Sequence, residues 1–194
     1  MTKPKFTTRK IVVVALLAAL TTAGSALRIT IPVSIAGTSS FHLGNILCAL
    51  SGILLGPWLG GLAAGLGSAI YDMLNPLYIS ECWITFLTKG AYGLMAGLVA
   101  FSGKMPWSAR SAKGCGKAYL ATAAGAVTYA IIYLSKSFFY NGIFLSGLTP
   151  ATAWIPVVDK LPATIFNAAI AILCAPLLAI AIDKALVKNH LSLR

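Results

Sequence analysis

LGNILCALSGILLGPWLGGLAAGLGSAIYDML, residues 43–74, contains two apolar runs that meet at Gly56-Pro57. Proline cannot continue a helix but fits the first turn of the next one, so this pair predicts a tight helical hairpin. The first run carries no charge, and the second carries none before Asp72. As helices they would reach about 20 and 25 Å, a little short of a hydrocarbon core of roughly 30 Å.

The second run is rich in glycine, at Gly60, Gly61, Gly65 and Gly67. In a soluble helix each glycine costs about 1 kcal/mol relative to alanine. Between membrane helices, small residues instead let a neighbouring backbone approach closely. The pattern therefore predicts a helical hairpin packed inside a membrane bundle.

The composition of the whole chain agrees with a membrane protein. Its 194 residues are 58% hydrophobic and 10% charged, with a mean hydropathy of +0.86, whereas about a quarter of the residues in a soluble domain are charged. We expect an all-α membrane protein, residues 1–194 forming one integral domain with six transmembrane helices. The spans are expected at about 11–28, 43–55, 57–74, 83–102, 118–145 and 157–187.

Two segments beside these spans carry further expectations. Residues 29–42 contain Pro32 and Gly37 and are expected to form a loop. Asp159 is expected to cap the last helix, with Pro162 in its first turn. A cleaved signal peptide competes for residues 11–27, but that run is long for one and Arg28 follows it in place of small residues.

The net charge of +11 does not point to nucleic acid, because the basic residues are dispersed between apolar spans. With six spans, both termini and the loop at 103–117 share one side of the membrane. That side collects eleven of the fifteen basic residues: Lys3, Lys5, Arg9, Lys10, Lys104, Arg110, Lys113, Lys117, Lys184, Lys188 and Arg194. The positive-inside rule then places both termini in the cytoplasm.

Motifs for catalysis are missing from the sequence. His42 and His190 are expected at opposite faces, and the four cysteines lack the spacing of metal ligands. No nucleotide-binding glycine motif is complete. We therefore expect no enzyme activity, no cofactor and no metal site, and any uphill transport would draw its energy from an ion or a partner.

Charged residues inside the spans mark a candidate ligand site in the outward half of the bundle. Lys89 and Lys136 are expected about 9 and 13 Å below the outer ends of their helices, where a charge normally faces a cavity or a counter-charge. The candidate ligand-binding residues are Arg28, Asp72, Asn75, Tyr78, Trp83, Lys89, Lys136, Tyr140, Asn141 and Asn167. Structural ion pairs or snorkelling lysines, and an interfacial belt for the aromatic residues, remain alternative interpretations at this point.

The first span carries a stripe of small residues, Ala15, Ala19 and Ala23, at four-residue spacing. Such a stripe lets another helix pack at close range. Packing within the bundle and packing against a partner subunit are both open on spacing alone.

The chain resembles the S components of energy-coupling factor (ECF) vitamin importers, in the branch often labelled riboflavin-type. The likeness rests on the basic N-terminus before the alanine-striped first helix, an outer loop containing IPV, and two longer segments. These segments are FHLGNILCALSGILLGPWLGGLAAGLGSAIYDML and TFLTKGAYGLMAGLV, at residues 41–74 and 85–99. The sequence differs from the commonest pattern at Asn45, where an acidic residue is expected.

The resemblance implies a six-helix subunit that captures a vitamin from outside and works with one transmembrane scaffold subunit and two ATPase subunits. It implies that Ala15, Ala19 and Ala23 contact the scaffold, and that the outer loops at 29–42, 75–82 and 146–156 enclose the ligand. Among vitamins, cobalamin is slightly favoured for its size and phosphodiester, with riboflavin, pyridoxine and a hydroxymethylpyrimidine close behind. A stand-alone secondary carrier or channel is the alternative, although the chain shows no convincing internal repeat.

Overall fold

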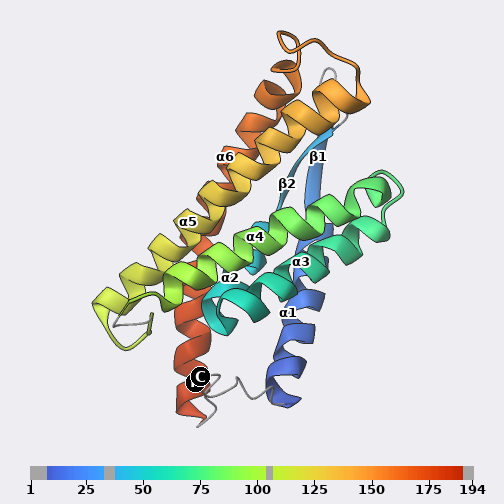
Figure 1. Ribbon diagram of the computed structural model, residues 1–194. Helices are drawn as coiled ribbons and strands as arrows, with labels where there is room; N and C mark the ends of the chain where they lie inside the picture. The colour runs from blue at the N-terminus through green and yellow to red at the C-terminus, as the bar shows by residue number, and fades with distance from the viewer. Residues whose placement is uncertain (1–7, 33–37, 104–106, 190–194) are drawn as a thin grey trace.

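The computed structural model describes residues 8–32, 38–103 and 107–189, which form a bundle of six α-helices with one small hairpin (Figure 1). The α-helices are α1 (Thr8–Ala26), α2 (Gly44–Leu55), α3 (Pro57–Met73), α4 (Cys82–Phe101), α5 (Ala112–Lys136) and α6 (Ile155–Lys188). The other elements are strands β1 (Arg28–Pro32) and β2 (Thr38–His42), the 3-10 helix η1 (Ile79–Glu81) and the π-helix η2 (Ser137–Leu145).

The predicted hairpin is present as α2 and α3, and its turn is Gly56-Pro57. Gly56 adopts a φ of 81°, a conformation that side chains other than glycine rarely adopt. Pro57 follows as the first residue of α3, where its missing N–H costs nothing. The hairpin is tight because these two residues end one helix and begin the next.

Helices α3 and α4 pack backbone to backbone. A Cβ atom on Gly93 of α4 would lie 2.7 Å from the carbonyl oxygen of Gly60 and 2.9 Å from the Cβ of Ala64, both on α3. The hydroxyl of Thr22 on α1 donates to the carbonyl oxygen of Gly67, 2.8 Å away, so α3 is held closely on both sides. The small residues in the hairpin thus determine how closely its neighbours pack.

Helices α5 and α6 lie side by side and extend beyond the tilted helices α3 and α4 (Figure 1). Two clusters of buried apolar residues fill the bundle. One surrounds Leu50, Ile53 and Trp107, and the other surrounds Cys48, Tyr92 and Tyr129. Asp183 of α6 accepts a hydrogen bond of 3.2 Å from the backbone N–H of Ala109, which attaches the connection between α4 and α5 to the bundle.

The region between the first two helices is not the loop that the sequence predicts. β1 and β2 pair antiparallel, with Arg28 opposite His42 and Thr30 opposite Ser40. The sequence Arg-Ile-Thr-Ile is well suited to a strand because β-branched residues fit a pleated backbone. The β1–β2 hairpin places the first residue of β1, Arg28, and the last residue of β2, His42, beside the helices.

Two helix starts also differ from the predictions. Helix α6 begins at Ile155, with Pro156 in its first turn and Trp154 at its cap, so Asp159 and Pro162 both lie inside the helix. Pro156 is the first-turn proline that the pattern called for, two turns earlier than expected. Helix α5 begins at Ala112 rather than near residue 118, because Ser111 caps it by accepting a hydrogen bond of 3.0 Å from the N–H of Gly114.

Within the part of the chain that the structure describes, four helical segments are long and apolar enough to cross a membrane: Thr8–Ala26, Ile79–Phe101, Ala112–Leu145 and Ile155–Lys188. The chain is therefore a multi-pass membrane protein. α2 and α3 have 12 and 17 residues, so at about 1.5 Å per residue they are shorter than the hydrocarbon core. That α2 and α3 also cross the membrane, which would give six spans, thus stays a prediction.

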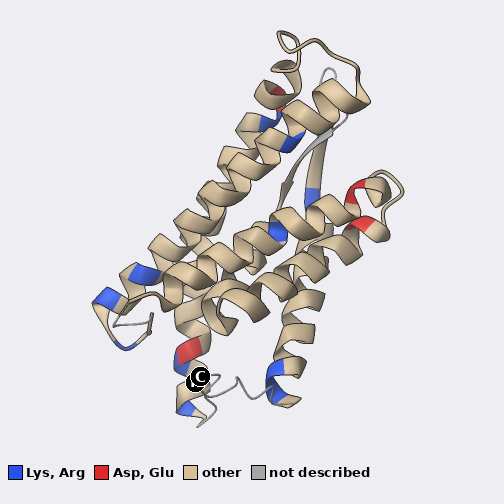
Figure 2. Cartoon of the chain, in the orientation of Figure 1, with Lys and Arg blue, Asp and Glu red and all other residues tan. Residues whose placement is uncertain are grey.

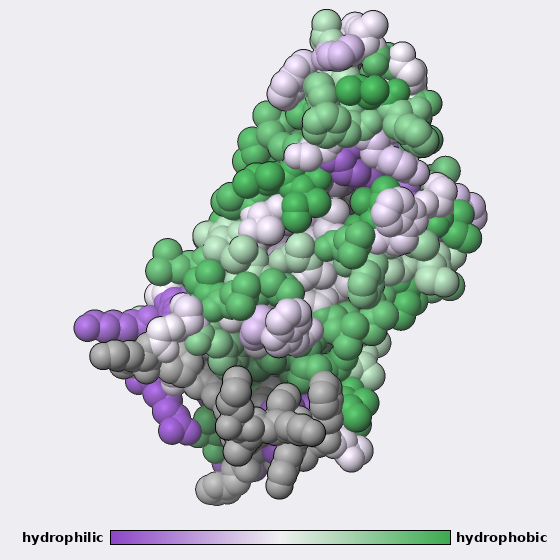
Figure 3. All heavy atoms as spheres, viewed as in Figure 1, coloured by the Kyte–Doolittle hydropathy of each residue, from purple (hydrophilic) through white to green (hydrophobic). Residues whose placement is uncertain are grey.

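The charged residues of the described part of the chain are distributed unevenly. Basic residues gather at the end of the bundle formed by the start of α1, the start of α5 and the end of α6 (Figure 2). Asp183 of α6 lies at the same end, and the remaining charges lie at mid-height and toward the opposite end (Figure 2). On the face shown in Figure 3, apolar atoms cover most of the middle of the molecule and a polar area interrupts them near the ends of α3 and α4. A cavity opens in that half.

Candidate ligand-binding site

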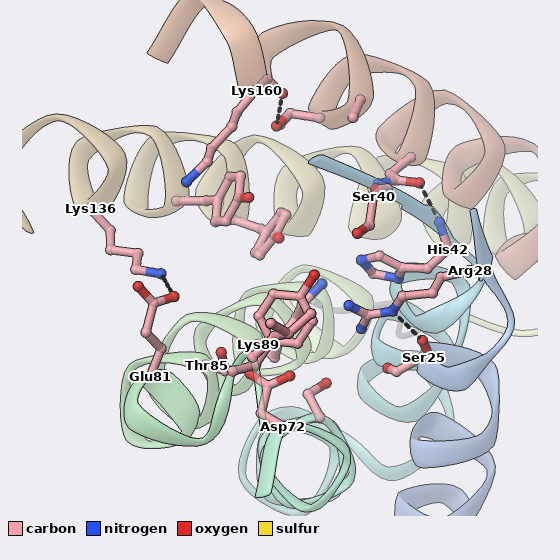
Figure 4. Close-up of a pocket in the computed structure, with 18 of the residues that line it drawn as sticks. Ser25, Arg28, Ser40, His42, Asp72, Glu81, Thr85, Lys89, Lys136 and Lys160 are labelled. Atoms are coloured by element: carbon pink, nitrogen blue, oxygen red, sulfur yellow. Dashed lines mark hydrogen bonds and ion pairs between the residues drawn. The ribbon is translucent and has the colours of Figure 1, made fainter. Parts of the chain in front are cut away.

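A cavity of about 270 Å³ lies between the β1–β2 hairpin, the outer ends of α3 and α4, and the α5–α6 pair (Figure 4). Nearly every element contributes to its wall. The lining residues are Ser25, Arg28, Ser40, His42, Ser68, Asp72, Leu77, Tyr78, Ser80, Glu81, Thr85, Lys89, Tyr129, Tyr133, Lys136, Asn141, Lys160, Ala163, Thr164 and Asn167. The wall is polar although the helices that build it are apolar.

Helical spacing explains why these polar groups converge. Thr85 and Lys89 are four residues apart on α4, and Tyr129, Tyr133 and Lys136 recur on α5. Lys160, Thr164 and Asn167 recur in the same way on α6. Residues at i, i+4 and i+7 share one helix face, so each helix presents a polar face to the cavity and an apolar one to its other neighbours.

Lys89 is a deeply buried cation of the cavity and is only 5% exposed. Its ammonium group donates a hydrogen bond to the side-chain oxygen of Asn45 and lies 4.0 Å from the centre of the Tyr129 ring. Both partners are uncharged. The positive charge of Lys89 is thus solvated by the protein without being neutralised by a direct ion pair.

A second polar cluster joins η1, α5 and η2. Lys136 forms an ion pair with Glu81, and the side-chain amide of Asn141 donates to the other oxygen of that carboxylate over 2.7 Å. The carbonyl oxygen of the Asn141 side chain is buried and has no hydrogen-bond partner among the described residues. It is an acceptor available to a ligand that carries an N–H or O–H group.

Arg28 lies at the start of β1 and is positioned by aromatic rings. Its guanidinium group is 4.1 Å from the centre of the Tyr71 ring and 4.9 Å from that of Tyr78. Its Nε donates to the carbonyl oxygen of Ser25 over 2.9 Å. These contacts leave the guanidinium group facing the cavity beside His42 (Figure 4).

Asn167 attaches β2 to α6. Its side-chain oxygen accepts from the backbone N–H of His42 over 3.0 Å, and its side-chain nitrogen donates to the carbonyl oxygen of Ser40 over 2.9 Å. The amide thus satisfies two backbone groups at the edge of the hairpin, as a neighbouring strand would. The β1–β2 hairpin is thereby held in place as one wall of the cavity.

His42 is the cavity's histidine and lies on β2, outside the membrane-spanning helices. Burial, followed by the positive charges of Lys89 and Arg28, holds its pKa well below the ordinary value of 6.5. Its Nδ1 accepts a hydrogen bond of 3.2 Å from the N–H of Gly44, which requires a free lone pair on that nitrogen. His42 is therefore neutral at physiological pH.

Three tyrosines form a stacked series that runs from the core to the cavity. The rings of Tyr92 and Tyr129 are 5.9 Å apart and inclined by 24°, and those of Tyr129 and Tyr133 are 5.3 Å apart and inclined by 16°. Tyr129 and Tyr133 line the cavity. They supply the flat apolar surface that an aromatic ligand ring requires.

Seven of the ten predicted site residues line this cavity: Arg28, Asp72, Tyr78, Lys89, Lys136, Asn141 and Asn167. Three do not. Asn75 hydrogen-bonds the Tyr71 hydroxyl and the N–H of Leu77, so it organises the connection after α3. Trp83 is 57% exposed and lies edge-on to Tyr140, whose ring also stacks on Phe144. An outward aromatic pair of this kind is typical of an interfacial belt.

Several lining residues were missed by the sequence reasoning, chiefly Glu81, Tyr129, Tyr133 and Lys160. The signal that would have found them is the polar spacing described above, because Tyr129 and Tyr133 precede Lys136 by seven and three residues. Nothing local identifies Ser40 and His42, because the hairpin that carries them was predicted as a loop. Among the described residues, no three His, Cys, Asp or Glu side chains come together as metal ligands.

The alanine stripe of α1 lies on the surface of this chain. Ala15, Ala19 and Ala23 are all exposed, while the buried side of α1 consists of Leu17, Ala18, Thr21, Gly24 and Ser25. Packing of the stripe inside the bundle, one of the two open interpretations, is therefore wrong. The small residues are presented outward over the length of the helix.

Comparison with known proteins agrees with this architecture. Residues 5–184 match the family described as ECF-type riboflavin transporter, S component. A protein of Pyrococcus woesei, described as an uncharacterized protein in gap 3'region, is 29% identical over 124 residues, which cover 64% of this chain and 74% of that protein. ECF S components bind a small vitamin and work with a scaffold and an ATPase module, and they are not enzymes. With nearly its whole length matched, this chain belongs to the family of ECF-type riboflavin transporter S components.

Proposed function

We propose that this chain captures a small vitamin with a flat heterocyclic ring from the outer side of the membrane. The observation that carries the proposal is the polar cavity with stacked tyrosines at one end of an apolar bundle. Tyr129 and Tyr133 offer a surface for the ring, and the buried oxygen of Asn141 offers an acceptor for a ring N–H or hydroxyl group. The remaining polar residues of the wall surround the substituents of the ring.

The cavity argues against cobalamin, the vitamin that the sequence slightly favoured. At about 270 Å³ its volume lies just below the range, about 300–1,000 Å³, that is typical of pockets for drug-sized ligands. A corrin ring with its nucleotide loop is much larger than such ligands. Smaller vitamins with one to three fused rings, such as pyridoxine, a hydroxymethylpyrimidine or riboflavin, suit this cavity better.

We place both termini in the cytoplasm, because the basic end of the bundle then faces inward and the cavity faces outward. Single cysteines in a background without the native thiols test this orientation. A cysteine at Ser111 should resist a membrane-impermeant reagent in intact cells, and one at Ser39 should react. The opposite labelling pattern would contradict the orientation.

Delivery across the membrane is proposed to need the coupling module, with the exposed face of Ala15, Ala19 and Ala23 as the contact for the scaffold subunit. Small side chains permit the close approach on which association in lipid depends. The alternative, a stand-alone carrier, would transport its solute without partners.

Three measurements test the proposal as a whole. Mass spectrometry of the purified protein should detect a co-purified heterocyclic vitamin, and the tagged protein should bring down ATPase subunits from its own membranes. Uptake of that vitamin into vesicles containing this chain alone should be absent. Transport by the isolated chain would favour the carrier instead.

A further inference from the structure

The cavity wall carries more positive than negative charge. Its lining includes four cations, Arg28, Lys89, Lys136 and Lys160, but only two carboxylates, Asp72 and Glu81. His42 adds no charge because its pKa is held low by burial. A membrane-embedded cavity with such an excess requires an explanation, because uncompensated buried charge is costly.

The ion pairs of the described residues do not remove this excess. Glu81 is occupied by Lys136 and Asn141. Lys89 has the neutral amide of Asn45 as its hydrogen-bond partner, at the position where the family resemblance predicts an acidic residue. Asp72 is the remaining carboxylate of the wall, and it interacts electrostatically with three of the cations, Arg28, Lys89 and Lys136 (Figure 4).

Lys160 is the cation of the wall for which these interactions supply no carboxylate partner. Its side chain is 5% exposed and extends from α6 into the cavity, with the ammonium group 5.8 Å from the centre of the Tyr133 ring (Figure 4). Its electrostatic neighbours are Lys136, which repels it, and Glu81 and Asp159, which attract it. Glu81 is already paired, and Asp159 does not line the cavity.

We propose that the ligand of this site is an anion, and that Lys160 binds its carboxylate or phosphate group while its ring lies against the tyrosines. An anionic group at this point would supply the missing negative charge and form a charge-assisted hydrogen bond with the ammonium group. This inference rests on the proposed function for the vitamin, and it narrows the substrate class to acidic or phosphorylated heterocycles.

Matched pairs of compounds that share a ring and differ in charge test the proposal on the purified full-length protein in detergent. Riboflavin against riboflavin 5'-phosphate and pyridoxal against pyridoxal 5'-phosphate probe a phosphate group, and nicotinamide against nicotinate probes a carboxylate. In at least one pair the anionic member should bind about tenfold or more tightly than the neutral one. The pair that shows the preference identifies the anionic group. The proposal would be overturned if at least one pair binds and, in every pair that binds, the neutral member binds as tightly as the anionic member or more tightly.

The variant Lys160→Met assigns the preference to this residue. It should reduce the affinity for the anionic member about tenfold and leave the affinity for the neutral member unchanged. Lys184→Met is the matched control, because Lys184 is an exposed lysine on the same helix far from the cavity, and it should change neither affinity. An anion preference that survives in Lys160→Met would remove Lys160 from the site.

A measurement without any vitamin separates this inference from the proposed function. In buffer of low ionic strength, Lys160→Met should melt a few degrees higher than the wild type, because it removes an uncompensated buried charge. Added inorganic phosphate should raise the melting temperature of the wild type and of Lys184→Met, but not of Lys160→Met. These melting temperatures test the anion site even if none of the six compounds binds. A lower melting temperature for Lys160→Met than for the wild type would show that the charge of Lys160 is already compensated within the fold, and it would refute the anion site. Equal responses of the wild type and Lys160→Met to phosphate would refute it as well. Failure to associate with ATPase subunits would contradict the proposed function alone.

Discussion

Lys89 is buried and Lys136 is mostly buried, and both lie beside the same cavity, yet their partners differ in kind. Lys136 is paired with a carboxylate, whereas Lys89 is held by an amide and an aromatic ring. The difference decides what each substitution removes. Replacing Lys136 leaves the Glu81 carboxylate without its ion-pair partner. Replacing Lys89 breaks no direct ion pair, because the groups that contact its ammonium group are neutral.

We therefore expect Lys89→Met to retain wild-type stability or gain slightly, since methionine is cheaper to keep in the membrane than lysine. Lys136→Met should lower the stability by about 1–3 kcal/mol, the cost of leaving a mostly buried polar group unsatisfied. Both should weaken vitamin binding by at least about 1 kcal/mol. Thermal unfolding in detergent, with the co-purified vitamin present and removed, checks both effects. Equal stabilities of the two variants would contradict the difference in pairing.

His42 gives the stability of the folded chain a dependence on pH. Its folded-state pKa lies below its unfolded value of about 6.5 because of burial and of the charges on Lys89 and Arg28, with Asn167 contacting only its backbone. As the pH falls below about 6.5 the unfolded chain takes up a proton that the folded chain does not bind, so stability is lost on the acid side and is level above it. The loss should approach about 1.4 kcal/mol per pH unit.

Melting temperatures of the wild type and of His42→Gln, compared between pH 7.5 and 5.5, measure this effect. The wild type should lose more stability than the variant over that interval. Because the other titrating groups are common to both proteins, the difference between the two slopes belongs to His42. Parallel slopes would mean that His42 is protonated in the folded state.

At the scale of the elements, the backbone contact between α3 and α4 positions the outer ends that carry Asp72 and Lys89. Gly93 has no room for a methyl group because the Gly60 carbonyl oxygen and the Ala64 Cβ occupy that space. Gly116 of α5, by contrast, has nothing within 4 Å of the position of a Cβ atom. The two glycines are thus a matched pair within helices.

Gly93→Ala should force α3 and α4 apart and lower the melting temperature, with a cost of about 1–3 kcal/mol for overpacking. It should also weaken vitamin binding, since both helices form cavity walls. Gly116→Ala should raise the stability by up to about 1 kcal/mol, the difference in helix propensity. Unfolding curves of the two variants should therefore shift in opposite directions. A Gly93→Ala protein as stable as the wild type would show that the helix contact is looser than the structure indicates.

At the scale of the whole molecule, the site and the exposed stripe of α1 lie on different parts of the bundle. The cavity is built from the ends of α3–α6 and the β1–β2 hairpin, whereas the stripe lies along the exposed side of α1, the helix whose start is at the basic end of the bundle (Figure 2). The lining residue closest to the stripe in the sequence is Ser25. Binding and coupling should therefore be separable by mutation.

Ala19→Trp should abolish complex formation and ATP-dependent uptake in cells that supply the coupling module, because a large side chain pushes the scaffold helix away. The isolated variant should bind its vitamin with near wild-type affinity. Leu173→Trp is the control, since Leu173 is an exposed apolar residue of α6, and it should transport normally. Normal transport by Ala19→Trp would exclude the stripe as the coupling surface, and a joint loss of folding and binding would contradict its outward position.

The fold class of this protein and the region of its candidate site can be predicted from the sequence alone, because they depend on properties of single residues and short segments. Apolar runs and glycine content identify a membrane bundle, and Gly56-Pro57 identifies the hairpin turn, since φ freedom and a missing N–H belong to single residues. The lysines at 89 and 136 also mark a site without reference to the rest of the chain, because a charge within an apolar helix must find a polar environment. Seven of the ten residues expected from the sequence line the cavity, and their contact with a ligand stays a prediction.

The tertiary structure decided what those charges meet. Glu81 is separated from Lys136 by 55 residues and from Asn141 by 60, and Asn167 reaches β2 across 125 residues. No local pattern contains such pairings, because they depend on how the helices are arranged around one another. The same arrangement turns Trp83 outward and leaves Tyr140 outside the cavity, although both neighbour the site in sequence. It also brings Lys160 inward without an ion pair to any carboxylate of the described residues. Composition thus determines that the chain enters the membrane and carries charge there, while the packing of its helices determines which charges remain for a ligand.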